Sequence, residues 1–374
     1  MSELPSELEI KRIPTRKIHV GSVAIGGDAP VVVQSMCNTP TGDVEATLAQ
    51  IRRLADAGCQ LVRVALPSVR ELPALEELSR TSPLPVVADI HFDGRLAVKA
   101  LEAGVQGIRV NPGNIPDGDA LREAARLAAE SGQAVRVGVN LGSLSPRAKE
   151  KYGATAQAMV ESAREYLELF ENAGCQNLKV SLKASGIPLT LQACRLFRTL
   201  SPWPLHLGLT EAGTPAQGIL KSAITLGCLL LEGIGDTIRV SLTAPPEEEI
   251  TAAFRILDAL GMRPGRPQLV ACPTCGRTRI GLIPLATRVE AAINRLLAKG
   301  YTLPFKKVAV MGCPVNGPGE AADADLGIAG GVGKGVLFRK GQIQETLPED
   351  QLLPALLREL EKAAGAPPGT ADET

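Results

Sequence analysis

The sequence has few aromatic residues, no net charge and no long apolar run. Phe, Trp and Tyr make up 3% of its 374 residues, and 40 Lys and Arg balance 40 Asp and Glu. Basic or aromatic patches mark proteins that bind nucleic acid or membrane surfaces, so this composition supports neither class. No stretch reaches 18 uninterrupted apolar residues, and residues 1–20 lack the apolar core of a signal peptide. We therefore expect no membrane span and a cytoplasmic protein.

Cysteine and histidine are also sparse. Eight Cys in a chain of this length do not form the dense disulfide framework of a small secreted domain, so we expect a reducing compartment. In that setting a Cys-x-x-Cys pair is more typical of a metal or redox site than of a crosslink. Apolar residues are abundant, at 45% of the chain, and they are enough to form large cores in about two domains.

One pattern recurs eight times between residues 31 and 242: a short β-branched apolar run, polar residues, and a helical stretch rich in Ala, Leu and Glu. Such alternation is typical of βα units. Eight of them favour a closed (β/α)8 TIM barrel, with an open doubly wound sheet as the alternative. The predicted strands are Val31–Met36, Leu61–Leu66, Pro85–Ile90, Gly107–Asn111, Ala134–Asn140, Asn177–Lys183, Leu205–Thr210 and Thr237–Leu242.

A short hairpin or plug, with a turn at Gly26-Gly27-Asp28, is predicted before the barrel over residues 17–30. The barrel domain is expected to span residues 1–263, with an eighth helix over Glu247–Leu260. A smaller α+β domain should follow over residues 264–374. Its predicted strands and helices are Gln268–Ala271, Leu285–Lys299, Lys307–Met311, a hairpin of Gly335–Arg339 and Gln342–Thr346, and Glu349–Ala364.

Cations gather where the predicted strands end, which is the catalytic end of a TIM barrel. The residues expected there are Arg63, Arg109, Asn111, Arg136, Asn140, Lys183, Arg239 and Ser241. Buried cations are costly without partners, so Asp89, Glu211 and Asp236 could pair with some of them. Because the cations still outnumber these acids, we predict a binding site for a small multiply charged anion, most simply a diphosphate.

Two strand ends also carry groups suited to acid–base or orienting roles. One predicted strand closes with Asp89-Ile90-His91, and another with Thr210-Glu211. A single His is more often structural than catalytic, but its place at a strand end favours function. We predict Asp89, His91 and Glu211 as catalytic residues.

The C-terminal domain contains three cysteines that could share one metal centre. Cys272 and Cys275 lie in Cys-Pro-Thr-Cys, and Cys313 opens a Gly- and Pro-rich segment that ends at Glu320. No His occurs in this domain, so a Cys3His zinc site cannot form from its own residues. Three thiolates with Glu320 as the nearest fourth ligand favour a catalytic iron–sulfur cluster. A structural zinc and a redox dithiol are the alternatives.

The chain resembles the 4-hydroxy-3-methylbut-2-en-1-yl diphosphate synthases of the methylerythritol phosphate route, over about residues 12–362. The resemblance rests on Val33-Gln34-Ser35-Met36, Ala88-Asp89-Ile90-His91-Phe92-Asp93, Arg109-Val110-Asn111-Pro112-Gly113-Asn114, Lys179-Val180-Ser181-Leu182-Lys183-Ala184-Ser185, Thr210-Glu211-Ala212-Gly213, Glu232-Gly233-Ile234-Gly235-Asp236-Thr237, Cys272-Pro273-Thr274-Cys275 and Asn316-Gly317-Pro318-Gly319-Glu320. Cys37 stands where Thr is usual in that family. The short linker matches the family's two-domain bacterial form.

The resemblance implies a reaction and a division of labour between the two domains, one holding the cluster and the other the diphosphate. The family opens the ring of 2-C-methyl-D-erythritol 2,4-cyclodiphosphate and reductively removes an oxygen as water, with two electrons from reduced flavodoxin or ferredoxin. By resemblance, Cys272, Cys275, Cys313 and Glu320 would hold a [4Fe–4S] cluster, and the barrel-end cations with Asn111, Asn140 and Ser241 the diphosphate. It also implies a head-to-tail homodimer with the active site between subunits.

Two other functions remain open on the sequence alone. A pterin-binding transferase could use the same kind of barrel, with Asp89, Asn111 and the cations, and would need no iron. A zinc module that binds nucleic acid or protein would need a basic or aromatic surface near the cysteines, and residues 265–374 show little of either.

Overall fold

The computed structural model describes residues 10–365 apart from 112, 114, 116–117, 314–318 and 320. By its contacts the chain divides into two compact units between Ile256 and Leu257. The boundary predicted after residue 263 lies a few residues further along the chain.

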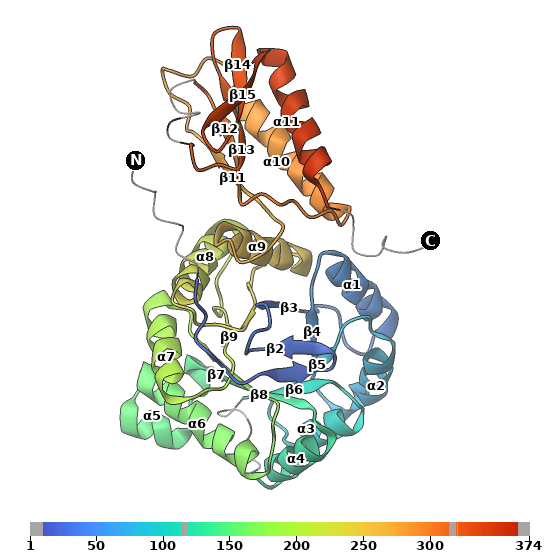
Figure 1. The fold of residues 1–374 in the computed structure, drawn as a ribbon. Helices are drawn as coiled ribbons and strands as arrows, with labels where there is room; N and C mark the ends of the chain where they lie inside the picture. The colour runs from blue at the N-terminus through green and yellow to red at the C-terminus, as the bar shows by residue number, and fades with distance from the viewer. Residues whose placement is uncertain are drawn as a thin grey trace. The chain divides into compact units, whose positions relative to one another are not determined.

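The first unit is a closed parallel barrel (Figure 1). Its strand order is β8-β7-β6-β5-β4-β3-β10-β9, and a parallel bridge between Val180 and Leu205 joins the two ends. Closure confirms the predicted barrel and excludes the open doubly wound sheet. The strands are β3 (Val32–Met36), β4 (Leu61–Leu66), β5 (Val86–Ile90), β6 (Gly107–Val110), β7 (Ala134–Asn140), β8 (Leu178–Lys183), β9 (His206–Leu207) and β10 (Thr237–Ile238).

Amphipathic helices form a ring around these strands (Figure 1). In the first of them, Asp43 caps the N-terminus by accepting a hydrogen bond from the Ala46 amide, and Ile51 and Leu54 are buried. The helical elements are α1 (Val44–Asp56), η1 (Val69–Glu71), α2 (Leu72–Thr81), α3 (Arg95–Glu102), α4 (Gly118–Ser131), η3 (Leu141–Ser143), α5 (Pro146–Tyr152), α6 (Ala156–Asn172), α7 (Ile187–Leu200), α8 (Pro215–Leu231) and α9 (Pro246–Ala259).

β9 and β10 are much shorter than the runs predicted for them, Leu205–Thr210 and Thr237–Leu242. Beyond Leu207 and Ile238 the chain leaves the sheet, and residues 209–213 and 241–243 line a cavity instead. A backbone hydrogen bond from Thr243 to Gly213 joins these two segments. The apolar pattern continues past the ladder because Leu209, Ala212 and Val240 stay buried beyond the strand ends.

The predicted hairpin before the barrel is present as β1 (Ile18–Val20) and β2 (Val23–Ile25), paired antiparallel. Its connecting turn is at Gly21-Ser22, so the predicted position was wrong. Gly26-Gly27-Asp28 does form a turn, closed by a hydrogen bond from Ala29 to Gly26, but it follows the hairpin. Ser22 gave no strong turn signal, whereas two consecutive Gly did.

The second unit holds a five-stranded sheet in the order β11-β12-β13-β14-β15 (Figure 1). The predicted elements are confirmed with small shifts at their ends, and β13 is a strand that the sequence analysis missed. Apolar side chains of both helices pack with those of the sheet in one core cluster. The elements are β11 (Gln268–Ala271), α10 (Leu282–Ala298), β12 (Lys307–Met311), β13 (Leu326–Gly330), β14 (Lys334–Arg339), β15 (Gln342–Pro348) and α11 (Glu349–Ala363).

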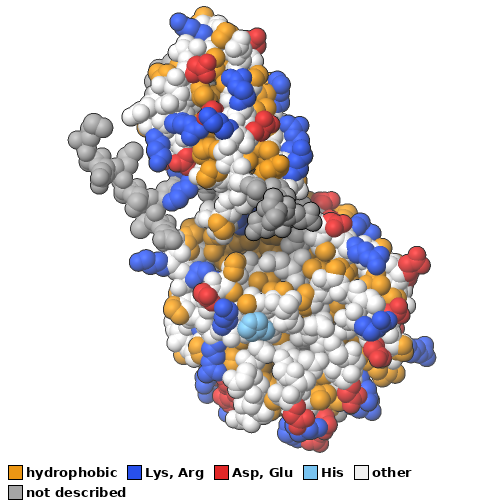
Figure 2. Space-filling view, turned by 45° about the vertical axis from the view of Figure 1, so that its right-hand side comes forward, with side chains coloured by type: hydrophobic (Ala, Val, Ile, Leu, Met, Phe, Trp, Pro, Cys, Tyr) orange, Lys and Arg blue, Asp and Glu red, His pale blue; other side chains and the backbone are white. Residues whose placement is uncertain are grey.

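Charged side chains of both signs lie on the face of the molecule drawn in Figure 2. On the face drawn in Figure 2, Lys and Arg are interspersed with Asp and Glu over the outer helices of the barrel. Within the described ranges, no helix combines the length and apolar character needed to cross a membrane.

Candidate active site

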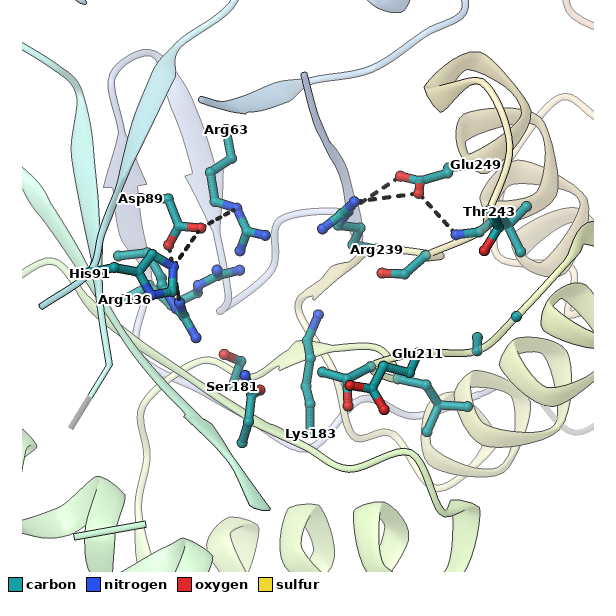
Figure 3. A pocket seen from close by; sticks show the side chains of 18 residues that line it. Arg63, Asp89, His91, Arg136, Ser181, Lys183, Glu211, Arg239, Thr243 and Glu249 are labelled. Carbon is teal, nitrogen blue, oxygen red and sulfur yellow. Dashed lines mark hydrogen bonds and ion pairs between the residues drawn. The ribbon is translucent and has the colours of Figure 1, made fainter. Parts of the chain in front are cut away.

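The C-terminal ends of the barrel strands surround a cavity of about 380 Å³ (Figure 3). It brings together most of the residues predicted from the strand ends. Asn111 is not among its lining residues, and the Oδ1 atom of Asn111 is buried without a hydrogen-bond partner in the described part of the chain. The predicted residues that line it are Arg63, Asp89, His91, Arg109, Arg136, Asn140, Lys183, Glu211, Arg239 and Ser241.

Asp89 organises one side of the cavity. Its carboxylate lies 3.1 Å from Arg109 Nη1, 3.5 Å from Arg63 Nε and 3.3 Å from His91 Nε2. Although burial alone would raise the pKa of Asp89, Arg63, the hydrogen bond with His91 and Arg109 hold it well below its usual value. Asp89 therefore stays ionised and fixes two guanidinium groups and an imidazole, all from residues that line the cavity.

Glu249 organises the opposite side, and the sequence analysis missed it. Its carboxylate oxygens accept hydrogen bonds from Arg239 at 3.3 and 3.4 Å and from the Leu242 amide at 3.0 Å (Figure 3). Ser35 Oγ donates to the same carboxylate at 3.2 Å. The only sequence signal was a run of three Glu in the first turn of α9, where acidic residues are common anyway.

Arg136 and Lys183 have no anionic partner within the described residues. Both are buried, at 2% and 7% exposure, and both line the cavity. Nε and Nη1 of Arg136 have no hydrogen-bond partner there either. Burial, and then the neighbouring Arg side chains with Arg136 first, lower the pKa of Lys183 well below its usual value. The excess of cations predicted from sequence is thus real and lies inside one cavity.

Two of the three acids expected to neutralise these cations do not do so. Asp236 pairs with Arg12 at 2.5 Å and accepts from the Leu205 amide, so it ties the N-terminal segment to the barrel. Glu211 lines the cavity but forms no ion pair in the described part of the chain. Its backbone has a positive φ of 56°. Such a conformation is strained for a residue with a side chain, and such strain tends to cluster at functional sites.

Two glycines make room for the cations. A Cβ on Gly138 would lie 2.6 Å from Arg109 Nε, and one on Gly208 would lie 2.8 Å from Lys183 Nζ. Any other residue at either place would displace a charged group of the cavity. Ser181 also lines the cavity, one alternation before Lys183 on β8. That alternation was visible in the sequence, although Ser181 was assigned no role.

In the second unit, two parallel strands bring Cys272 and Cys313 to the same edge of the sheet. Cys272 follows β11 directly, and Cys313 lies two residues after β12, its neighbour in the sheet. The Gly312 amide donates a hydrogen bond to Cys272 Sγ at 3.1 Å. Amide hydrogen bonds of this kind stabilise the thiolates that bind iron–sulfur clusters. A backbone amide therefore approaches the sulfur of one of the three cysteines, Cys272.

Cys275 is exposed, and hydrogen bonding by the Arg277 backbone is the main cause that lowers its pKa. Burial instead raises the pKa of Cys37 and Cys194 in the barrel to about 12. Of these three thiols, only that of Cys275 is therefore favoured as a thiolate. Within the described residues, no group of three His, Cys, Asp or Glu stands close enough for a single metal ion. Glu320 lies outside the described residues.

Comparisons with known proteins agree with the sequence motifs. The family described as "GcpE TIM-barrel domain" matches residues 15–254, and "GcpE protein C-terminal domain" matches residues 268–362. A solved dihydropteroate synthase from Stenotrophomonas maltophilia aligns with a TM-score of only 0.48 at 17% identity, over 66% of this chain and 97% of that one. That likeness carries no functional argument.

Relatives similar over nearly their whole length bear one name. A protein of Geobacter sulfurreducens is 51% identical over 93% of this chain and 97% of its own, and one of Persephonella marina is 48% identical over 94% and 99%. Both are named 4-hydroxy-3-methylbut-2-en-1-yl diphosphate synthase (flavodoxin). The chain belongs to the 4-hydroxy-3-methylbut-2-en-1-yl diphosphate synthase family, iron–sulfur oxidoreductases of isoprenoid precursor biosynthesis.

Proposed function

We propose that the cationic cavity of the barrel binds the diphosphate of 2-C-methyl-D-erythritol 2,4-cyclodiphosphate. The product is (E)-4-hydroxy-3-methylbut-2-enyl diphosphate, formed by a reductive ring opening that takes up two electrons and two protons and releases one water. The observation that carries this proposal is the pair of buried cations without an anionic partner in the described chain, Arg136 and Lys183. Buried guanidinium groups demand counter-charge, and a diphosphate supplies it with oxygens that suit bidentate donors.

The remaining barrel residues divide into binding and orienting groups. Arg63, Arg109 and Arg239 would bind the diphosphate while keeping their carboxylate partners, Asp89 and Glu249. Asn140 and Ser241 add neutral hydrogen-bonding groups on the cavity wall. Asn111 would join them only if its buried side chain turned towards the cavity. Negative charge released on ring opening would be stabilised by this fixed set of donors.

His91 and Glu211 are proposed as the catalytic groups that exchange protons, and the ionised Asp89 as the catalytic-site residue that orients His91. The Nε2 atom of His91 faces both Asp89 and Arg109, at 3.3 and 3.2 Å, and the side chain is partly exposed at the cavity. With its Nε2–H donated to Asp89, His91 keeps Nδ1 free to exchange a proton with a substrate hydroxyl. Glu211 stands on the opposite wall (Figure 3). Its exposed carboxylate could accept or return a proton at the same substrate.

Cys272, Cys275 and Cys313 fit an iron–sulfur centre in their chemistry, since they are three thiols of which one accepts a backbone amide hydrogen bond. We propose that they hold a [4Fe–4S] cluster with Glu320 as fourth ligand. When bound, such a cluster supplies single electrons and a Lewis-acidic iron. Glu320 could also carry a proton.

The relatives' names point to flavodoxin as electron donor, and we propose reduced flavodoxin, or ferredoxin in its place, for this chain. A homodimer with the active site between subunits, and a cytoplasmic location, stay predictions.

A direct test is turnover of the cyclic diphosphate by anaerobically purified holoprotein with reduced flavodoxin, followed by mass spectrometry of the product. The proposal expects the linear allylic diphosphate. Substrate recovered unchanged from protein that carries its full iron and sulfide would refute the proposal.

A further inference from the structure

Below the cavity, the barrel interior contains polar side chains that the proposed chemistry does not use. Lys179 and Gln34 are 1% exposed and His206 is fully buried. In the described part of the chain, Lys179 Nζ, His206 Nε2 and both amide atoms of Gln34 lack a hydrogen-bond partner. None of the three residues lines the cavity. Buried polar atoms are nearly always partnered, so this layer calls for a physical explanation.

The strand register places Lys179 behind the cations of the cavity. Arg109 on β6 pairs with Arg136 on β7, and Arg136 pairs with Lys179 on β8. Alternate residues of a strand share one face, so Lys179 points to the same side as Ser181 and Lys183. Those two line the cavity, and Lys179 precedes them, so its amine lies deeper in the barrel.

The charged groups that act on Lys179 are cationic. Burial is the main cause that lowers the pKa of Lys179, and Arg136 from β7 and Arg63 from β4 add to it. Together they bring the pKa of Lys179 to about 7. His206 from β9 is held neutral, because burial and then Lys183, Arg136 and Lys179 push its pKa well below the usual value. Its Nδ1 contacts Thr237 Oγ1 at 2.9 Å. No described carboxylate forms an ion pair with Lys179.

We propose that Lys179, whose buried amine has no partner in the described chain and lies in register with Arg136, is a proton-linked positioning residue that takes up a proton when the diphosphate enters the cavity. The inference rests on the proposed function, because it needs an anionic ligand in front of Arg136. Negative charge at the cavity favours the ammonium form of Lys179, and the proton comes from solvent. No bond of the substrate changes in this step.

Proton uptake on ligand binding avoids the cost of burying a second cation in the free protein. An ammonium group beside Arg136 in the free protein would be costly, and a neutral amine avoids that cost. Once the ligand is bound, the proton gives Lys179 a positive charge, which adds to the attraction that Arg136 exerts on the diphosphate. Above pH 7 the proton must be taken from solution, so affinity for the ligand should fall as pH rises.

The test is titration calorimetry of the cyclic diphosphate into oxidised holoprotein without reductant, at pH 8, in two buffers of different ionisation enthalpy. Each phosphorus of this ligand carries one strongly acidic hydroxyl, so the ligand itself does not titrate near neutral pH. The wild type should take up as much as about one proton per site. Lys179→Met should lose most of that uptake, and its Kd should vary several-fold less between pH 7 and pH 9.

Two further variants make the result decisive. Lys179→Arg stays charged and so should bind without the proton uptake, even if Lys179→Met folds poorly. Lys99→Met, at an exposed ion pair on α3, should behave as wild type. Proton uptake that is undiminished in Lys179→Arg or Lys179→Met would overturn this inference and leave the proposed function standing. Failure of the wild type to bind the cyclic diphosphate would overturn the proposed function, and the inference with it.

Discussion

The guanidinium group of Arg239 is held by the carboxylate of Glu249 through contacts of 3.3 and 3.4 Å. Glu249 is 4% exposed, and it also accepts hydrogen bonds from Ser35 and from the Leu242 amide. One buried acid thus fixes both a cation of the cavity and the segment that carries Ser241. Glu249 acts through Arg239, as a positioning residue for the diphosphate.

Glu249→Ala should raise KM for the cyclic diphosphate by about tenfold or more, because Arg239 loses its buried ionic partner and its orientation. Iron content should not change. Steady-state kinetics with anaerobic holoprotein measure the effect. Glu248→Ala, an exposed neighbour on the same helix, is the matched control and should leave KM within about twofold. Equal KM values for the two variants would show that Glu249 does not position Arg239.

Arg136→Ala should raise KM strongly or abolish turnover while iron and sulfide per chain stay at the wild-type level. The reason is that Arg136 offers unpartnered donors to the cavity, whereas the cysteines lie in the other unit. Parallel kinetics and metal analysis check both halves of this expectation. Loss of the cluster in this variant would contradict the proposed division of labour.

Lys179→Met should raise the thermal unfolding temperature at pH 7. The pKa of Lys179 lies lower in the folded protein than in the unfolded chain, so unfolding takes up a proton between about pH 7 and 10.5. This group therefore makes wild-type stability increase with pH across that window. Lys179→Met lacks the cost of burying this titratable amine, which is on the order of several kcal/mol of unfolding free energy at pH 7. Its gain in stability over the wild type should vanish near pH 10.5. Calorimetric melting against pH, with Lys99→Met as control, checks the sign, and a lower melting temperature for Lys179→Met at pH 7 would contradict it.

Cys272→Ser, Cys275→Ser and Cys313→Ser should each lose most of the iron and all turnover, because each would remove one thiolate from the cluster. Cys228→Ser, on helix α8 of the barrel, should keep both. Iron analysis and the visible charge-transfer spectrum report the cluster independently of activity. Iron content unchanged in any of the first three variants would remove that residue from the proposed ligand set.

Much of the fold could be predicted because its signal is local. Eight apolar runs alternating with helical patterns required parallel strands, and parallel strands place their carboxyl ends at one site. The lengths of β9 and β10 could not be predicted, because Leu209 and Val240 stay buried after the strands end. β13 was missed because Leu-Gly-Ile-Ala-Gly has two Gly and no polar alternation.

The candidate site was predictable in its charges but less so in its pairing. Arg63, Arg109 and Arg136 could be placed because strand alternation fixes which side chains face inward. Partners depend on tertiary placement, so Glu249 was missed and Asp236 was assigned to the wrong neighbour. The same alternation could have indicated Lys179, but sequence cannot tell a buried unpaired amine from one with a partner.

The most direct measurement is the content of iron, acid-labile sulfide and zinc in the chain purified without oxygen. The account predicts about four irons and four sulfides per chain with negligible zinc, as a [4Fe–4S] centre on three cysteines requires. About one zinc and no sulfide, in protein never exposed to air, would contradict it.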